Sequence, residues 1–282
     1  QTDEHQRETF ISYINIKNQQ TIPAVFNRLE ELFSICDVKM NLKNNKINLL
    51  VTAPINKNNI QSEKFKFPGH TDYLAQELDG DSLMFMICDE LKIGLLTDHV
   101  ALKEINRHVT KQRIEQKFSL INESLKKDFG IQKPKIAVLS IDPHAGDGGV
   151  IGKDDQDILK PVLLEIASKN NLVFGPFSSD SFFGSGQHKK YDAVLAIYHD
   201  QGLIPFKTLS FGSGVNYTAG LNKVRTSPDH GTGYDIAGKG LADSTSFKNA
   251  IFSAIEIFKS RKLFEDLNKN PLNLSNSKTA KK

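Results

Sequence analysis

Short apolar runs that alternate with segments of helical periodicity constrain the fold of this chain more than any other feature of its sequence. The apolar runs lie at residues 10–16, 46–54, 83–88, 91–97, 135–141 and 191–198. Apolar side chains recur at helical spacing over residues 21–36, 109–129, 158–167 and 244–260. Strands that alternate with helices are typical of an α/β fold with a largely parallel sheet, and the sequence predicts that architecture.

Composition and charge exclude several classes of protein. Of the 282 residues, 39% are hydrophobic and 24% are charged, and the net charge is only +3, so neither a nucleic-acid partner nor a disordered chain is expected. No apolar run approaches the roughly 20 residues of a membrane span, and no secretory leader pattern is present. Cys36 and Cys88 lie far apart in apolar stretches, which favours free thiols in a reducing compartment. We therefore expect a cytoplasmic protein without a membrane partner.

Three of the predicted strands end directly in a polar cluster that contains a histidine. The three histidines are His99, His144 and His199. Ligands of open α/β sheets bind at the carboxyl ends of strands, so the three imidazoles are expected to converge on one cation. Neutral imidazole suits zinc, manganese, cobalt or iron, and three protein ligands leave positions open for substrate. A single histidine in such a place is more often held by hydrogen bonds in a loop, and the repetition of the pattern favours the metal site.

Two further segments carry candidate ligands for an anion. Pro68 and Gly69 predict a turn, and His70 and Thr71 directly after it can hydrogen-bond a phosphate or carboxylate. A turn followed by a helix-capping threonine explains the same residues, and the sequence leaves both interpretations open. In the polar stretch 205–243, Arg225 offers a planar fork for a phosphate or carboxylate.

Lys207 is a candidate general acid or base. It lies eight residues after His199, so a hairpin or tight bend would return it to the metal. A lysine desolvated beside a cation would have a lowered pKa and could transfer protons.

The glycine-rich segment 144–152 does not match a nucleotide-binding fingerprint. Ile151 stands where the dinucleotide motif needs its third glycine, and the lysine of a phosphate-binding P-loop is missing. The glycines are instead expected to let the backbone turn tightly beside His144. A nicotinamide cofactor would have to bind by another route.

The motifs of this chain resemble those of the 4-hydroxythreonine-4-phosphate dehydrogenase family of vitamin B6 synthesis. The matching blocks lie at residues 51–57, 67–71, 143–149, 193–203, 214–216 and 225–232, within a resemblance that runs from about 45 to 260. It implies metal ligation by His99, His144 and His199, and substrate contacts from His70, Thr71, Lys207, Asn216 and Arg225. It also implies a homodimer whose active site takes residues from both subunits.

The family is similar in turn to the isocitrate and isopropylmalate dehydrogenases, which implies a two-lobed α/β/α fold. Their H-G-[ST]-x-x-D-I-A-G-K-G stretch contacts the adenosine part of the cofactor, and residues 230–240 fit it closely. The resemblance thus implies that NAD is contacted by His230, Gly231, Thr232 and Asp235. The expected division is a cofactor-side lobe of 1–62 and 208–268, a metal, substrate and dimer lobe of 63–207, and a disordered tail of 269–282. The family begins with a strand and a Gly/Pro-rich turn that we expect this chain to lack.

The implied reaction is NAD-dependent oxidation of 4-phosphooxy-L-threonine, followed by decarboxylation to 3-amino-2-oxopropyl phosphate. One divalent cation (Zn, Mg, Co or Mn) would favour the alkoxide and stabilise the enolate. Lys207 is the candidate for proton transfer, and Asp200 would orient His199 or shuttle protons. Two alternatives stay open: a dehydrogenase for threonate or erythronate 4-phosphate, and a truncated, non-catalytic metal-binding paralogue.

Overall fold

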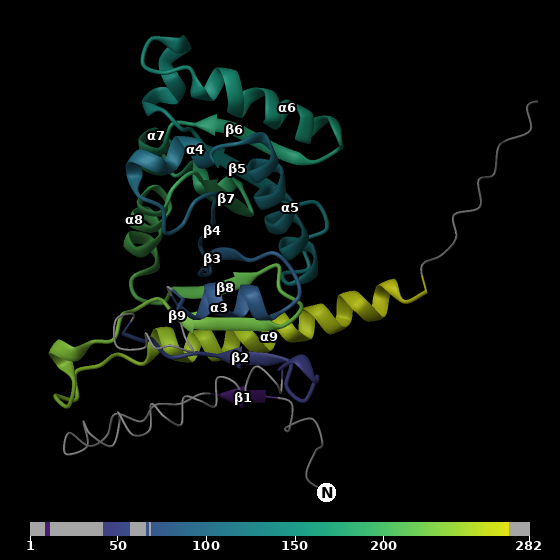
Figure 1. Cartoon of the computed structure of the whole chain (residues 1–282), viewed down its shortest axis with the longest axis vertical. Helices are drawn as coiled ribbons and strands as arrows, with labels where there is room; N and C mark the ends of the chain where they lie inside the picture. The colour runs from purple at the N-terminus through teal and green to yellow at the C-terminus, as the bar shows by residue number, and fades with distance from the viewer. Residues whose placement is uncertain (1–8, 12–41, 57–65, 68, 271–282) are drawn as a thin grey trace, which may run out of the picture.

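The computed structural model describes residues 9–11, 42–56, 66–67 and 69–270. Across these residues the chain forms one mixed β-sheet with helices packed on both of its faces (Figure 1). The predicted helix over 21–36, Cys36 and the tail from residue 271 onward lie outside the described residues. The described residues include no helix with the length and apolar character that crossing a bilayer requires.

The elements of the described residues follow the alternation that the sequence predicts. The strands are β1 (Thr9–Ile11), β2 (Leu49–Val51), β3 (Leu83–Ile87), β4 (Lys92–Leu95), β5 (Lys135–Leu139), β6 (Leu172–Phe177), β7 (Ala193–Ala196), β8 (Val215–Ala219) and β9 (Val224–Pro228). The helices are α3 (His70–Glu77), α4 (Ile105–His108), α5 (Lys111–Lys127), α6 (Lys160–Ser168), α7 (Ser179–Gly184), α8 (His199–Ser210) and α9 (Thr245–Asn268). Short turns of other helical types are η4 (Leu102–Glu104), η5 (Pro143–Gly149), η6 (Asp155–Leu159), η7 (Gln187–Lys190) and η8 (Tyr234–Ile236).

The apolar runs and the periodic segments that fall within the described residues are confirmed as strands and helices. The runs form β2, β3, β4, β5 and β7, and the periodic segments form α5, α6 and α9. The strands β6, β8 and β9 were not predicted. β8 and β9 carry polar side chains, which weaken the apolar signal of a strand. In β6 the apolar run Leu-Val-Phe is interrupted by Gly175 and Pro176, which favour a turn.

Strand order divides the sheet into two parallel groups. The order is β1-β2-β9-β8-β3-β4-β7-β5-β6. The strands β1, β2 and β9 run parallel to one another, as do β4, β7, β5 and β6. The antiparallel strands β8 and β3 join the two groups. The fold is thus mixed α/β, as expected, and the lobe boundaries at 62/63 and 207/208 stay a prediction.

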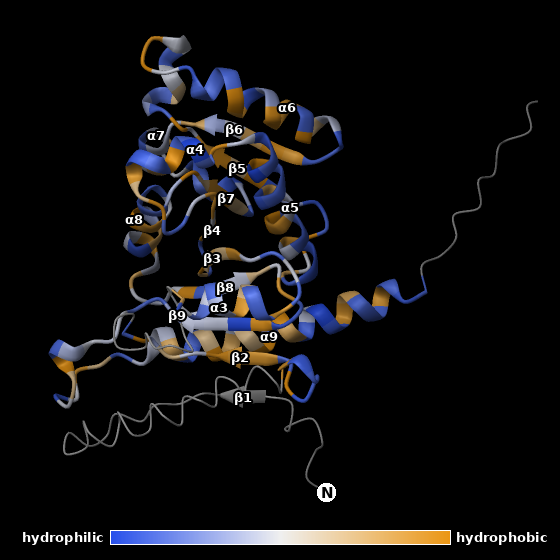
Figure 2. Cartoon of the chain, in the orientation of Figure 1, coloured by the Kyte–Doolittle hydropathy of each residue, from blue (hydrophilic) through white to orange (hydrophobic). Residues whose placement is uncertain are grey.

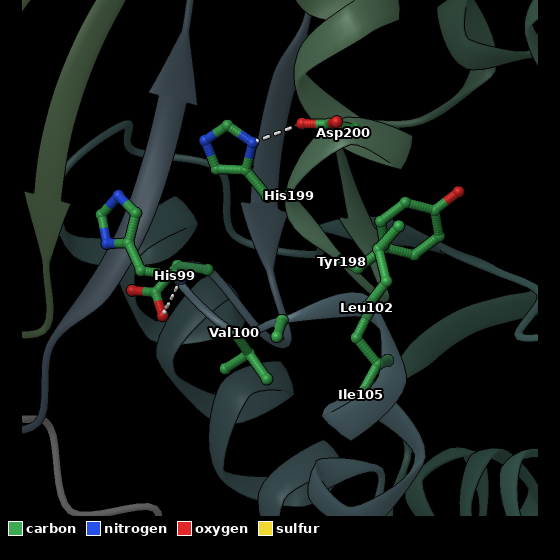
Figure 3. A pocket seen from close by; sticks show the side chains of 9 residues that line it. His99, Val100, Leu102, Ile105, Tyr198, His199 and Asp200 are labelled. Atoms are coloured by element: carbon green, nitrogen blue, oxygen red, sulfur yellow. Dashed lines mark hydrogen bonds and ion pairs between the residues drawn. The ribbon is translucent and has the colours of Figure 1, made fainter.

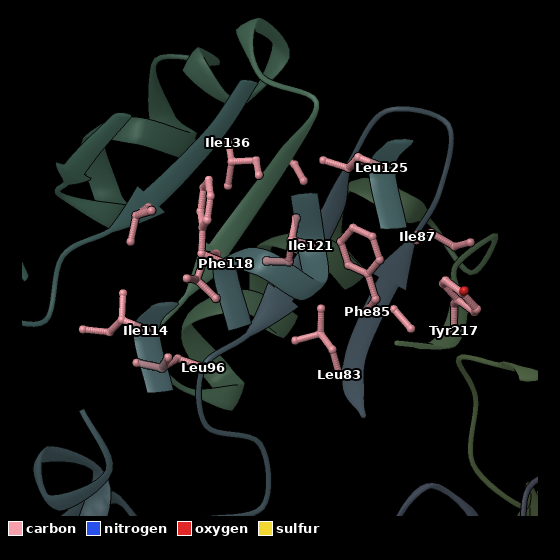
Figure 4. Close-up of a cluster of buried hydrophobic side chains, with 14 of the residues drawn as sticks. Leu83, Phe85, Ile87, Leu96, Ile114, Phe118, Ile121, Leu125, Ile136 and Tyr217 are labelled. Atoms are coloured by element: carbon pink, nitrogen blue, oxygen red, sulfur yellow. The ribbon is translucent and has the colours of Figure 1, made fainter. Parts of the chain in front are cut away.

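Alternate side chains of the central strands enter two separate cores. Ile136 and Val138 of β5 join the core under α5, α6 and α9, whereas Ala137 and Leu139 join the core under α7 and α8. Figure 4 shows the first core, where the apolar stripe of α5 meets the sheet. Colouring by hydropathy places the apolar residues on the strands and on the inward faces of the helices (Figure 2). The predicted stripe of α5 is confirmed, with Leu120 only partly buried.

A buried ionic network ties α9 to the rest of this core. The Arg261 guanidinium donates from Nε to Asp128 Oδ1 at 2.6 Å and from Nη2 to the Tyr217 hydroxyl at 2.7 Å. The Tyr217 hydroxyl and Ser124 Oγ each donate to Asp128 Oδ2 at 2.6 Å. All four side chains are buried, and burial together with the Asp128 carboxylate raises the pKa of Tyr217 well above its usual value. The network joins the C-terminal end of α5, β8 and α9.

Removing the carboxylate of this network is expected to destabilise the protein strongly. Asp128→Ala leaves the Arg261 guanidinium buried without its counter-charge, which costs about 3–5 kcal/mol of unfolding free energy. Urea unfolding at fixed protein concentration measures the loss. Asp266→Ala removes an exposed partner of Lys269 and serves as the control, with no measurable change expected. Equal stabilities of the two variants would contradict the role of the network.

Candidate functional site

The three predicted metal ligands follow the ends of three adjacent parallel strands. β4 pairs with β7 and β7 pairs with β5, all in parallel, so their carboxyl ends meet at one edge of the sheet. His99, His199 and His144 come three to five residues after these ends. The sequence argument for a common edge is thereby supported. The ring centroids of His99 and His199 lie 5.9 Å apart, and Figure 3 shows the two imidazoles side by side.

A pocket of about 350 Å³ opens beside these two imidazoles. Its lining residues are Asp98, His99, Val100, Ala101, Leu102, Ile105, Tyr198, His199 and Asp200. One wall is apolar and the other carries two histidines and two aspartates, a combination typical of a small-molecule site. In Figure 3, Leu102, Ile105 and Tyr198 lie together on one side of the imidazole pair.

Asp200 orients one of the two imidazoles. Its Oδ1 lies 2.7 Å from Nδ1 of His199 (Figure 3). With Nδ1 engaged by the carboxylate, Nε2 is left as the atom that can bind a metal, and metal-binding histidines commonly have such a partner. The donor set of His99 and His199 therefore suits a divalent metal ion.

Asp98 brings a second carboxylate to the pocket. Burial raises the pKa of this group, but the backbone N–H of His99 and neighbouring positive charges hold it below its usual value. The Oδ1 atom accepts from the His99 backbone N–H at 2.9 Å, so Asp98 also fixes the start of the loop that carries His99.

His144 does not line this pocket. Within the described part of a single chain, no group of three His, Cys, Asp or Glu side chains is placed to hold a metal ion. His144 lies on η5, where six consecutive residues (144–149) have positive φ. The expected tight turn beside His144 is confirmed, and its left-handed conformation strains the non-glycine residues in it.

Arg225 forms a buried cationic site on β9. Its guanidinium donates to the hydroxyls of Thr52, Thr71 and Thr218 at distances of 2.6–3.2 Å. Among the described residues no carboxylate pairs with it, so hydroxyls are its only side-chain partners there. Burial lowers the pKa of Arg225 to about 10, which still leaves it positively charged at neutral pH. A buried cation with neutral partners is suited to hold an incoming phosphate or carboxylate.

His70 is the neutral neighbour of this cation. It begins α3 and is buried. Burial, and then the positive charge of Arg225, lower the pKa of His70 to about 3. The imidazole is therefore uncharged at neutral pH and can offer an N–H to an anion without repelling Arg225. The structure thus brings His70, Thr71 and Arg225 together, as the resemblance implies.

Asn216 extends the same polar row along β8. Thr218 pairs with Arg225 across the β8–β9 ladder, and Asn216, two residues away, points to the same face of the sheet. The Oδ1 atom of Asn216 is buried and has no hydrogen-bond partner among the described residues. A buried amide oxygen of this kind is suited to accept a hydrogen bond from a ligand.

Lys207 departs from its prediction. It lies on α8, so the expected hairpin after His199 is wrong, and the rise of a helix separates the two residues by roughly 12 Å along its axis. The Nζ atom of Lys207 pairs with Asp229 Oδ1 at 3.1 Å. The Lys207 side chain is 52% exposed, so the predicted desolvation is also not seen. Burial raises the pKa of Asp229, while Lys207 and, more weakly, His230 and His199 lower it. The Lys207–Asp229 pair is therefore within electrostatic range of His199.

The segment predicted to contact the cofactor leaves the sheet after β9. Figure 1 shows it projecting from the body of the protein before α9 begins. His230 is exposed, and its Nδ1 lies 2.8 Å from the backbone oxygen of Gly231. Thr232 is half-buried and Asp235, in η8, is exposed. Polar groups in this segment are accessible to a ligand.

Sequence reasoning missed several residues that surround Arg225, Lys207 and the pocket beside His99 and His199. Thr52, Thr218 and Asp229 hold the Arg225 and Lys207 side chains, and Tyr198 lines the pocket. Thr52 and Asp229 lie within the motif blocks 51–57 and 225–232, and this position was the one sequence feature that could have marked them as site residues. Thr218 carries no such signal, because only the pairing of β8 with β9 brings it to Arg225.

Comparisons with known proteins agree with these motifs. Residues 30–254 match the family described as "Pyridoxal phosphate biosynthetic protein PdxA". The 4-hydroxythreonine-4-phosphate dehydrogenase of Bacteroides thetaiotaomicron is 50% identical over 228 residues, which are 80% of this chain and 63% of the relative. The same-named protein of a Sulfurihydrogenibium species is 45% identical over 77% of this chain and 67% of the relative.

A solved structure supports the fold. The crystal structure of 4-hydroxythreonine-4-phosphate dehydrogenase from Klebsiella pneumoniae matches with a TM-score of 0.68 at 35% identity. The match covers 78% of this chain and 67% of that one. The chain thus shares its α/β fold with such a dehydrogenase, and it spans 63% of the length of the Bacteroides relative.

His70 is expected to make the protein lose stability in mild acid. Its pKa is about 3 when folded and 6.5 when unfolded, so below pH 6.5 only the unfolded state binds this proton. Stability should fall as the pH drops toward 3, by up to about 1.4 kcal/mol per pH unit from this group. Urea unfolding of the wild type and His70→Gln from about pH 7 to pH 4 should show a shallower slope for the variant. If the stability of both proteins changed equally with pH, the lowered pKa of His70 would be contradicted.

Proposed function

Because the chain belongs to the PdxA family of pyridoxal phosphate biosynthetic proteins, we propose that it is a dehydrogenase for 4-phosphooxy-L-threonine. It would use NAD and one divalent metal ion (Zn, Mg, Co or Mn), and would release carbon dioxide and 3-amino-2-oxopropyl phosphate. The observation that carries the proposal is the pair of imidazoles, His99 and His199, whose ring centroids are 5.9 Å apart beside an acidic pocket.

His99 and His199 would hold the metal ion, with Asp200 fixing the tautomer of His199. When bound, the metal ion would polarise the substrate hydroxyl and NAD would accept the hydride. Val100, Leu102 and Ile105 form the apolar wall of the pocket. The chain thereby supplies two nitrogen donors and a partly apolar wall.

The substrate phosphate is assigned to the buried cation of β9. Arg225 has only hydroxyl partners among the described side chains, and a phosphate would supply the missing negative charge. Thr71 Oγ1 and the neutral His70 lie beside it and add hydrogen-bonding groups. Asn216 Oδ1 lacks a partner in the described residues and would accept from a donor group of the substrate.

Proton transfer is assigned to the Lys207 side chain. Its Nζ is held by both the carboxylate and the backbone oxygen of Asp229, each at 3.1 Å. Asp229 keeps the ammonium in place, and the exposed side of Lys207 gives it exchange with water. Asp200, held on the His199 ring, remains the second candidate for moving a proton.

The site would be completed by a second copy of the chain. His144 is absent from the pocket of its own chain, so a three-histidine site needs it from elsewhere. The same loop exposes the apolar side chains of Val150 (84%) and Ile151 (51%), which favours contact with another protein surface. A homodimer in which His144 acts on the partner's pocket accounts for both features.

The segment 230–240 is assigned to the adenosine part of NAD. It fits the corresponding stretch of the isocitrate and isopropylmalate dehydrogenases, and His230 and Asp235 are exposed in it. The contacts would come from His230, Gly231, Thr232 and Asp235. No glycine fingerprint elsewhere in the sequence competes for this role.

Complementation between two inactive variants tests the shared site. His144→Ala and His199→Ala should each abolish metal binding and turnover with the fold intact. When the two variants are co-expressed, a mixed dimer has one intact pocket. In it, the His144→Ala chain supplies His99 and His199, and the His199→Ala chain supplies His144. Random pairing should then restore about a quarter of wild-type NADH formation, because half of the dimers are mixed and each has one intact site.

The control is co-expression of His99→Ala with His199→Ala, which removes two ligands of the same pocket and should restore no activity. Turnover of His144→Ala alone at a near-normal rate would refute the metal assignment. If co-expressed His144→Ala and His199→Ala showed no activity, the proposal that the metal site is shared between two subunits would be refuted.

Substrate preference and the role of Arg225 are tested together by NAD reduction. The wild type should reduce NAD faster with 4-phosphooxy-L-threonine than with threonate or erythronate 4-phosphate. Arg225→Lys keeps the charge but loses the fork, so KM for the phosphorylated substrate should rise about tenfold to a hundredfold. The exposed Arg107, paired with Glu104, provides the control Arg107→Lys. A preference for a sugar acid phosphate would select the alternative substrate, and an unchanged KM in Arg225→Lys would contradict the phosphate assignment.

A further inference from the structure

The side-chain amide of Gln201 connects three separate parts of the chain at the edge of the sheet. It lies in the first turn of α8, two residues after His199. Its Oε1 accepts from the backbone N–H of Ile197 at 2.7 Å. Its Nε2 donates to the backbone oxygen of Ser140 and to Ser179 Oγ, both at 2.8 Å. Both ends of the amide are therefore engaged.

These contacts lie where the ladder hydrogen bonds of the sheet end. Ile197 directly follows β7, and Ser140 directly follows β5. The pairing of β5 with β7 ends at Val138 and Leu195, and Gln201 supplies partners to backbone groups that follow both strands. Thr97, after β4, joins the same set because its N–H and its hydroxyl both donate to the Ile197 oxygen, at 3.1 and 2.7 Å. The amide thus links the ends of β7 and β5 directly, and Thr97 ties the end of β4 to the same residue, Ile197.

The linked strand ends are the ones that lead to the predicted metal ligands. His99 comes two residues after Thr97, His199 two residues after Ile197, and His144 four residues after Ser140. We propose that Gln201 is a positioning residue of the metal site, an inference that rests on the proposed function. Its amide holds the strand ends that lead to His199 and His144 at a fixed distance from each other.

At position 201, an uncharged amide fits its backbone partners better than a carboxylate or an apolar side chain would. It donates and accepts at once, as the Ser140 oxygen and the Ile197 N–H require. A carboxylate of the same size would place an acceptor against the Ser140 oxygen, and would also add a negative charge near the histidines. An apolar side chain would leave both backbone groups without the partner that Gln201 provides.

Metal affinity of the full chain tests the proposal. Gln201→Met keeps the length of the side chain and removes the amide. Titration calorimetry with Mn²⁺ should show a Kd weakened about tenfold to a hundredfold, the usual effect of losing a group that orients metal ligands. Excess Mn²⁺ should restore part of kcat. Hydrogen exchange of the metal-free protein should become faster at the Ile197 amide. Gln116→Met is the matched control, since the Gln116 amide makes an exposed contact with Asp81, and it should keep the wild-type Kd.

Gln201→Glu provides a second variant if Gln201→Met does not fold. It keeps the acceptor for Ile197 and loses the donor to Ser140, so a weakened Kd is again expected. A wild-type Kd in a folded Gln201 variant, or an equal loss in Gln116→Met, would overturn the positioning role and leave the proposed function standing. A wild type that binds no Mn²⁺, Zn²⁺, Co²⁺ or Mg²⁺ would instead overturn the proposed function itself.

Discussion

The parallel pairing of β4, β7 and β5 is the constraint on which the rest of the site depends. Parallel neighbours have their carboxyl ends at one edge, so the loops that follow them must share that edge. Gly202 of α8 keeps this edge compact, because a Cβ there would come within 2.9 Å of Ile93 and Leu95 of β4. The helix can therefore start directly at His199 and lie close against the sheet. Close packing of α8 and parallel pairing together decide where the imidazoles lie.

The strands that the sequence predicted are those whose side chains are apolar on both faces. β5 and β7 are buried on both sides, so each reads as a continuous apolar run. β9 is equally buried but reads Val-Arg-Thr-Ser-Pro, because Arg225 faces a polar site, and Thr226 on the opposite face donates to the Ala250 backbone oxygen of α9. Hydrophobic periodicity reports contact with a core, and it has no signal for a buried strand that lines a binding site.

The error at Lys207 has a comparable cause. The expected bend rested only on the eight-residue separation of His199 and Lys207 in the sequence. In the structure both lie inside α8, where Gly202 allows the close contact with β4 and Pro205 is tolerated within the helix. Tertiary packing therefore overrides local propensity here. The sequence could predict that the histidines follow strand ends, but it could not show that His144 leaves the pocket of its own chain, because that depends on the left-handed course of η5.

Charge explains why the Arg225 site is built for an anion. A buried guanidinium without a carboxylate partner costs stability, and the hydroxyls of Thr52, Thr71 and Thr218 compensate its hydrogen bonds but not its charge. The neighbouring His70 stays neutral because a second positive charge there would be buried beside the first. A phosphate would supply the missing negative charge and accept hydrogen bonds from the guanidinium of Arg225. The chain places no negative charge beside Arg225 within the described residues, so the arrangement that costs stability without a ligand favours the binding of an anion such as a phosphate or carboxylate.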